Sequence, residues 1–258
     1  MRRLFLIALA CAIIVPAQAA SVTLNGQIRD FCAPSLSGCT QLADFEGTPF
    51  GGVTGMVSST LNSTGLPTYV GNGAGNTTTE NFNRWFVDSP GFNIMAPFSL
   101  TLNETAPGSG VYAYANSSFF PLDNQLYGNQ GRSHNYHFTL HLAGSTTFKA
   151  SDTFTFTGDD DLWIYVGGKL AVDLGGVHLA NTQTITGADL MLLGLLQDTV
   201  YGIDVFFAER HTTESNFNIT TSFRFVPGID NPGNPVPELT TWALMGLGLV
   251  AIGVRARA

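Results

Sequence analysis

The sequence predicts an all-β protein that folds as an antiparallel β-sandwich. Short segments in which apolar and polar residues alternate recur through the middle of the chain, and this period of two is typical of half-buried strands. Turn-forming Gly, Asn, Ser and Thr residues separate these segments at the spacing typical of sandwiches, about 8–12 residues. Residues 189–196 are ambiguous and can form one short helical turn.

The expected strands follow one another at residues 21–28, 136–142, 153–157, 162–166, 169–174, 201–208 and 218–226. Two glycines join the fourth and fifth of these segments as a hairpin, because both turn positions need a positive φ. In the second segment, alternation places Phe138 and Leu140 inward and His137 and His141 outward.

Residues 1–20 have the features of a cleavable signal peptide. Arg2 and Arg3 give a positive start, residues 4–15 are almost wholly apolar, and Ala17 and Ala19 are the small residues that a signal peptidase requires. The apolar run is too short to span a bilayer comfortably. We therefore expect an exported protein whose mature chain begins near residue 21.

The other end of the chain is also apolar. Residues 228–238 form a Pro-rich linker, and residues 239–258 contain an apolar, Gly-rich stretch closed by Arg255 and Arg257. This stretch is at or below the length of about 17 residues that a spanning helix needs, but a tryptophan and the arginines stand where interfacial anchors do. We expect a short C-terminal apolar helix that sorts or anchors the protein. The alternative is a buried core helix.

Residues 21–227 have the length of one β domain, and they are strongly acidic. Without the four terminal arginines and Glu238, the 11 basic and 19 acidic residues of the chain give a net charge of about −11. Binding to nucleic acid requires clustered Lys and Arg, and the chain has only two lysines. We therefore expect no nucleic-acid partner.

Cys32 and Cys39 are the cysteines that remain after removal of the signal peptide. In an exported protein a disulfide between them is expected. A C-x6-C pair offers too few ligands for structural zinc. His178 and His211 could meet from different loops, but the sequence shows no close ligand pair with a third partner, so polar packing is the favoured role for these histidines.

Three consecutive carboxylates, Asp159, Asp160 and Asp161, occupy a tight loop between two expected strands. Adjacent carboxylates repel, so at least one should have a raised pKa unless a cation or hydrogen-bond donors compensate. Oxygen ligands in a short loop suit Ca²⁺. The alternative is a solvated turn in which the Asp side chains cap their own backbone.

A second polar cluster follows the strand expected at residues 201–208. It comprises Glu209, Arg210, His211, Glu214 and Asn216. If this loop lies at the same end of the sandwich as the three aspartates, Glu209 or Asn216 could complete a calcium shell of about six to eight oxygens. The favoured alternative for Arg210 is an ion pair with a carboxylate that ties loops together, for example with Asp173.

The body resembles the fibro-slime domain, which is itself similar to the protective-antigen-type lectin-like β-sandwich module. The resemblance covers about residues 22–226, and its motifs occur in order at residues 29–31, 44–46, 82–85, 116–123, 128–139, 158–161 and 208–223. It implies a sandwich in which an Asp-Asp pair, here Asp159 and Asp160, holds a calcium ion beside a glycan. Trp163 and Tyr165 share one face of the next strand, and we expect them to pack in the sheet.

The tail resembles the PEP-CTERM sorting signal. The matching residues are Val236, Pro237, Glu238, Thr241, Trp242, Ala243 and Leu244, and Leu239 stands where a second proline is usual. This resemblance implies a Gram-negative producer of exopolysaccharide, in which an exosortase-type protease removes the tail. It places the protein at the cell surface, in the outer envelope or in the extracellular matrix.

We therefore expect a non-catalytic surface or matrix protein with a calcium-assisted carbohydrate-binding module for extracellular polysaccharide. The expected metal ligands are Asp159, Asp160 and Asp161, and the expected glycan-binding residues are Glu209, His211 and Asn216. A purely structural matrix or adhesion protein without a sugar site is the first alternative. A carbohydrate-active hydrolase is the second, although the sequence shows no nucleophile elbow, Cys–His pair or P-loop.

Overall fold

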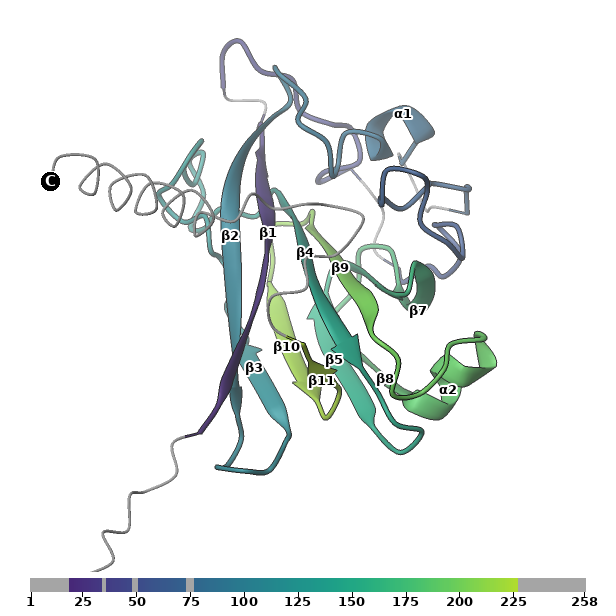
Figure 1. The fold of residues 1–258 in the computed structure, drawn as a ribbon. Coiled ribbons are helices and arrows are strands. Elements are labelled where there is room, and N and C mark those ends of the chain that lie inside the picture. The colour runs from purple at the N-terminus through teal and green to yellow at the C-terminus, as the bar shows by residue number, and fades with distance from the viewer. Residues whose placement is uncertain (1–18, 34–35, 48–50, 73–76, 227–258) are drawn as a thin grey trace, which may run out of the picture.

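The computed structural model describes residues 19–226 except 34–35, 48–50 and 73–76 (Figure 1). The predicted sorting segment lies outside the described residues, as does nearly all of the predicted signal peptide. In the part of the chain that is described, no helix has the length and apolar character needed to cross a membrane.

The described residues form eleven strands and two short helices, which confirms the all-β prediction. In order they are β1 (Ser21–Phe31), α1 (Thr79–Phe82), β2 (Asn93–Glu104), β3 (Tyr112–Asn116), β4 (Phe138–Thr147), β5 (Thr153–Asp159), β6 (Asp161–Val166), β7 (Lys169–Leu174), β8 (Asn181–Thr186), α2 (Gly187–Leu192), β9 (Tyr201–Glu209), β10 (Asn216–Thr221) and β11 (Arg224–Phe225).

One continuous antiparallel sheet contains all the strands. Its order is β7-β6-β9-β4-β1-β2-β3-β10-β5-β8, and β11 pairs with β4. The sheet curves so strongly that its two outer strands meet, and the backbone N–H of Asp173 in β7 donates to Gln183 Oε1 in β8 at 3.3 Å. Two halves of the same sheet therefore face each other and enclose the main core as a sandwich.

The main core contains the inward side chains of nearly every strand, including Leu140, Phe156, Phe207 and Phe217. A second hydrophobic cluster lies on the outer face of β6 and β9, where a layer of loops and α1 from the first third of the chain covers it. All six residues of β6 are buried for this reason. Trp163 and Tyr165 pack in this second cluster, as expected.

Phe138 and Leu140 point into the main core, so His137 and His141 lie on the opposite face of this segment, as alternation predicted. The same loop layer covers that outer face, so both histidines are buried. His141 Nε2 lies 2.9 Å from Asp204 Oδ1, and the imidazole stacks on Phe206. His137 Nε2 lies 3.1 Å from Glu46 Oε1.

The structure contains a disulfide between Cys32 and Cys39, whose Cα atoms lie 5.9 Å apart. We predict that replacing both cysteines by serine lowers the free energy of unfolding by about 2.5 kcal/mol, because the bond closes a loop of about eight residues in the unfolded chain. Urea unfolding measures this loss, and the wild type in reductant should match the variant. An intact mass that shows two free thiols in the unreduced protein would contradict the pairing.

Candidate functional site

The two polar clusters found in the sequence meet at one end of the sandwich. Strand β5 ends at Asp159 and β6 begins at Asp161, so Asp160 is the whole connection between them. Asp159 pairs across the sheet with Asn216, the first residue of β10, and Asp161 pairs with Ala208, next to the end of β9. The aspartate loop and the loop after β9 therefore lie at the same end of the sandwich, as the predicted shared site requires.

All three aspartates are buried, so the solvated-turn alternative does not describe them. The peptide bond between Asp159 and Asp160 is cis. The carboxylate of Asp159 accepts hydrogen bonds from the backbone N–H of Asn216 and, at 2.9 Å, from its side-chain amide. Burial raises the pKa of Asp159, and these hydrogen bonds from Asn216 oppose the rise.

Asp161 forms the ion pair that closes this end of the molecule. Its Oδ2 lies 2.6 Å from Arg210 Nε, and its Oδ1 accepts the backbone N–H of Gly176 at 2.6 Å. Both side chains of the pair are fully buried. Because Arg210 and Gly176 occupy both carboxylate oxygens, Asp161 orients the loop and is not placed as a free metal ligand.

Arg210 connects the strands to the loop layer. Its Nη1 donates to the carbonyl oxygen of Asp44 at 3.0 Å, and its guanidinium lies 4.7 Å from the ring centroid of Trp85. The sequence correctly favoured an Arg210–carboxylate network, but the suggested partner, Asp173, was wrong. Asp173 instead accepts hydrogen bonds from Trp163 Nε1 at 3.0 Å and from the backbone N–H of Gly55 at 2.7 Å.

Asp160 and Glu209 are acids without a cation of their own. Asp160 Oδ2 accepts the backbone N–H of Arg210 at 2.9 Å. Burial raises the pKa of Asp160 to about 8; the charge of Arg210 opposes the rise, and the charges of Asp161 and Asp159 add to it. Near neutral pH this end of the sheet therefore either keeps a proton or needs a second positive charge.

Glu209 was predicted to contact glycan, but it is fully buried and cannot reach a ligand at the surface. Its Oε1 accepts the backbone N–H of His211 at 3.3 Å. Its Oε2 has no hydrogen-bond partner of good geometry among the described residues, although Ser215 is close enough to lower the pKa. Burial and the charge of Asp160 raise the pKa of Glu209 well above its ordinary value.

The side chain of His211 lies next to Glu46. Its Nε2 lies 4.0 Å from Glu46 Oε2, which also accepts a hydrogen bond from Thr212 Oγ1 at 3.1 Å. Glu46 thus fixes the loop that follows β9. Sequence reasoning missed this role, because Glu46 and Thr212 are 166 residues apart in the chain.

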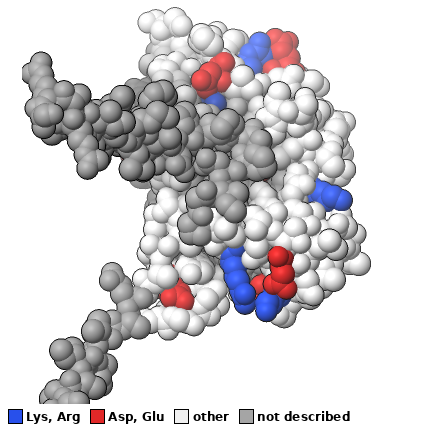
Figure 2. All heavy atoms as spheres, viewed as in Figure 1, with Lys and Arg blue, Asp and Glu red and all other residues white. Residues whose placement is uncertain are grey.

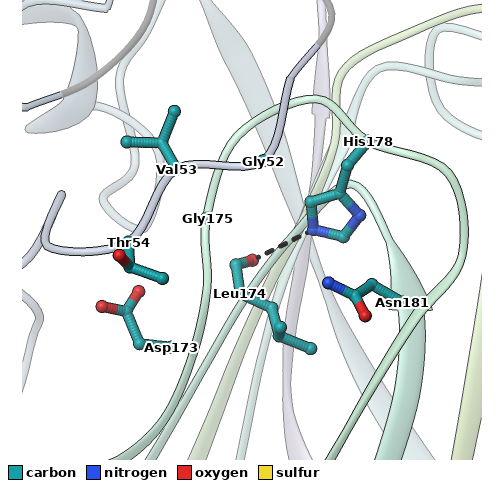
Figure 3. Close-up of a pocket in the computed structure, with 8 residues that line it drawn as sticks. All are labelled: Gly52, Val53, Thr54, Asp173, Leu174, Gly175, His178 and Asn181. Carbon is teal, nitrogen blue, oxygen red and sulfur yellow. Dashed lines mark hydrogen bonds between the residues drawn. The ribbon is translucent and has the colours of Figure 1, made fainter.

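A small cavity of about 190 Å³ lies at the same end of the sandwich (Figure 3). Its lining residues are Gly52, Val53, Thr54, Asp173, Leu174, Gly175, His178 and Asn181. Asn181 pairs with Gly158, next to the three aspartates, and the charge of His178 lowers the pKa of Asp159. The polar groups of Thr54, His178 and Asn181 could hydrogen-bond a small polar ligand there.

Within the described ranges, no group of three or more His, Cys, Asp or Glu side chains is arranged to hold a metal ion. The carboxylates of the three aspartates point at backbone N–H groups instead. Asp159 accepts one hydrogen bond on each oxygen and Asp160 accepts one on Oδ2, so a cation here would share these carboxylates with the backbone and with the Asn216 amide. Glu209 Oε2 has no hydrogen bond of good geometry among the described residues.

We predict that Arg210→Met lowers the free energy of unfolding by about 3–5 kcal/mol, because it leaves Asp161 buried without its counter-charge. Arg84→Met is the matched control, since Arg84 pairs with the largely exposed Glu80 and should cost about 0.5 kcal/mol or less. Urea unfolding of both variants measures the difference. Equal losses would show that the buried pair does not hold this end together.

Residues 124–229 match the PA14 domain family. Two relatives in Dictyostelium discoideum are protein psiQ, 38% identical over 228 residues, and protein psiC, 36% identical over 197 residues. The psiQ alignment covers 83% of this chain and 22% of psiQ; the psiC alignment covers 69% and 38%. The chain thus spans only about a fifth to two fifths of the length of these relatives.

Two solved structures are also similar at low scores. The PA14 domain of the MpAFP antifreeze protein is 11% identical with a TM-score of 0.33, and the alignment covers 86% of this chain and 90% of that domain. The PA14 sugar-binding domain of an RTX adhesin is 11% identical with a TM-score of 0.28, covering 79% and 95%. The family match supports a PA14 domain in this chain, within residues 124–229.

Proposed function

We propose that this domain binds extracellular polysaccharide, without catalysis, through a calcium ion held at the loop of Asp159 and Asp160. The observation that carries the proposal is the pair of buried acids, Asp160 and Glu209, for which Arg210 provides no second counter-charge because it is paired with Asp161. The PA14 match adds support, since the family resemblance in the sequence implies glycan binding by this type of module.

The donor set at this site fits calcium better than a transition metal. Asp159, Asp160 and Glu209 offer only carboxylate oxygens, and Asn216 adds an amide next to Asp159. Hard oxygen donors are the ligands of Ca²⁺, which takes about six to eight of them. Glu209 Oε2 is a buried oxygen without a hydrogen bond of good geometry among the described residues. When bound, the ion would offer coordination positions to sugar hydroxyls.

The protein's own residues would then position the glycan. His211 and Asn216 are partly exposed at the rim of the acidic cluster, and the cavity at Thr54, His178 and Asn181 lies at the same end. Neutral hydroxyl, amide and imidazole groups hydrogen-bond sugar hydroxyls without a charge requirement. The substrate class that suits this rim is a neutral or weakly charged polysaccharide.

A purely structural matrix or adhesion role remains the second candidate. The observation that favours it is that each aspartate of the loop already accepts a backbone N–H, from Asn216, Arg210 or Gly176. These bonds fix the loop without a metal. A carbohydrate-active hydrolase would instead turn over labelled polysaccharide, and the proposal expects no turnover.

The proposed cellular location of the protein is based on the two ends of the sequence. The signal-peptide features of residues 1–20 support export, and the PEP-CTERM-like residues 236–244 support processing by an exosortase-type protease. The protein would act at the surface, in the outer envelope or in the matrix of a Gram-negative bacterium. Its membrane contact through the tail would end with cleavage.

We predict that calcium at about 100 times its Kd raises the melting temperature by about 5–10 °C at pH 8 and by less at pH 5. The raised pKa of Asp160, about 8, means that the folded state binds a proton that the unfolded state releases, so stability falls as pH rises from about 4 to 8. Calcium replaces that proton and restores the lost stability. Scanning calorimetry with and without calcium measures the effect.

The matched pair of variants for this test is Asp160→Asn and Asp30→Asn. Asp30 is also buried and has its pKa raised by burial to about 7, but its carboxylate accepts the backbone N–H of Tyr127 and takes no part in the acidic cluster. Asp160→Asn should abolish the calcium response, and Asp30→Asn should preserve it. Absence of calcium binding at millimolar concentration in titration calorimetry would remove the metal site from the proposal.

We also predict binding to extracellular polysaccharide on a glycan array in calcium, and its loss in chelator. His211→Ala should weaken the signal, because His211 lies at the partly exposed rim. His134→Ala is the control, since this partly exposed histidine pairs with Asp123 outside the acidic cluster. Calcium binding without any glycan signal would favour the structural alternative.

A further inference from the structure

The small cavity beside the three aspartates has walls that two consecutive glycines hold close together. The backbone N–H of Val53 donates to the carbonyl oxygen of Gly175 at 2.6 Å, so residues 51–53 lie against the turn that follows β7. A Cβ atom at Gly175 would lie 2.6 Å from the carbonyl oxygen of Val53. At Gly176, where φ is +89°, a Cβ atom would meet the carbonyl oxygen of Gly51. Larger residues at either position would push these segments apart, so the shape of the cavity depends on the glycines.

Asp173 places a carboxylate without a counter-charge in the lining of this cavity. Its Oδ1 accepts a hydrogen bond from Trp163 Nε1 at 3.0 Å, and its Oδ2 accepts the backbone N–H of Gly55 at 2.7 Å. Both donors are neutral, and Asp173 forms no ion pair among the described residues. Burial and the charge of Asp173 raise the pKa of Tyr165, so the negative charge is felt nearby. Each carboxylate oxygen can accept a further hydrogen bond.

The other polar groups of the lining are uncharged or can be so. Figure 3 shows the Thr54 hydroxyl beside the carboxylate of Asp173 on one side of Leu174, with the side chains of His178 and Asn181 on the other. None of the eight lining residues is a lysine or an arginine. The cavity therefore combines one negative charge with hydroxyl and amide groups, and no fixed positive charge opposes it.

His178 adds a hydrogen-bond acceptor when its ring is neutral. Its Nδ1 lies 2.8 Å from the carbonyl oxygen of Leu179, which can only accept, so Nδ1 carries the proton of the neutral ring. Nε2, which lies 3.5 Å from the carbonyl oxygen of Leu174, then keeps its lone pair. Both this nitrogen and this carbonyl oxygen can accept a hydrogen bond from an O–H or N–H group of a ligand.

We propose that this cavity binds an amino sugar whose ammonium group lies against Asp173. The sugar hydroxyls bond to His178 and Asn181. An ammonium group has three donors and no acceptor, which matches a lining of carboxylate, hydroxyl and carbonyl oxygens without a cationic side chain. The volume of about 190 Å³ is below the range of about 300–1,000 Å³ for drug-sized ligands, so the cavity suits a single sugar unit.

This inference rests on the proposed glycan binding, because it names a sugar unit that a largely neutral polysaccharide would present at the same end of the sandwich. A free calcium ion suits the cavity less well. Ca²⁺ takes about six to eight oxygen ligands, and Asp173 is the only carboxylate in the lining.

The test is titration calorimetry of the purified full chain at about pH 7 in chelator, with glucosamine, N-acetylglucosamine and glucose as separate ligands. Most of the glucosamine carries its charge at this pH. Glucosamine should bind about tenfold or more tightly than the other two sugars, because hydrogen bonds between charged groups are the stronger ones. The chelator keeps the loop of Asp159 and Asp160 free of calcium.

Asp173→Asn should remove the preference for glucosamine, and its melting temperature shows whether the fold is intact. Asp198→Asn is the matched control: it removes the same charge from an exposed position before the start of β9, where a φ of 57° suits asparagine. Thr54→Val is a second variant at an exposed position, so it should keep the fold and weaken glucosamine binding severalfold.

Equal affinities for the three sugars would overturn the inference, as would unchanged glucosamine binding by folded Asp173→Asn. Glucosamine binding that appears only after calcium is added would place the sugar at Asp159 and Asp160, and it would overturn the inference too. Glucosamine binding in chelator that Asp173→Asn abolishes, without any polysaccharide signal on the array, would support the cavity site and contradict the proposed function.

Discussion

The buried ion pair between Arg210 and Asp161 is the interaction on which the candidate site depends. Arg210 joins the first residue of β6 to the carbonyl of Asp44 and to the face of Trp85, so one side chain links the sheet to the loop layer. A buried pair adds little stability by itself, because desolvation offsets most of the attraction. Its effect here is geometric: it fixes where the segments from the first third of the chain lie against β6 and β9. Those segments then bury Trp163 and Tyr165 and form the wall of the cavity at Gly52–Thr54.

This arrangement also determines the electrostatics of the acidic end. Arg210 forms its ion pair with Asp161. Its charge only partly offsets the effect of burial on Asp160, and Glu209 is buried beside Asp160. The pKa values of Asp160 and Glu209 are therefore raised, so both carboxyls keep their protons at pH values well above those at which exposed carboxyls lose them. This end of the sandwich buries more carboxylates than cations. Either a bound proton or a bound metal ion can compensate the excess negative charge. Hydrogen bonds from Asn216 relieve Asp159 but do not reach Glu209 Oε2.

The sequence predicted the features that local pattern encodes. Alternation located the strands around Phe138, Phe156 and Phe207, and the ambiguous segment at residues 189–196 overlaps α2, which forms a short helix. Strands β2, β3 and β8 were missed; β8 reads NTQTIT, which is nearly all polar. The burial of His137 and Glu209 could not be predicted, because it depends on loops from distant parts of the sequence that cover the outer face of the sheet. The meeting of Asp159 with Asn216 was anticipated only conditionally, since alternation fixes the face of a strand but not its neighbour.

Many of the acidic residues in this protein are buried, so its composition overstates the negative charge of its surface. Seven acids of the described chain are buried: Asp30, Asp44, Asp159, Asp160, Asp161, Asp204 and Glu209. Among the basic residues, Arg29 and Arg210 are buried as well. The surface consequently carries far less negative charge than the sequence indicates, and Figure 2 shows a face on which uncharged residues dominate. Such a face offers hydrogen bonds and apolar contacts over wide areas. It therefore suits an uncharged partner such as a polysaccharide better than it suits a highly charged polymer.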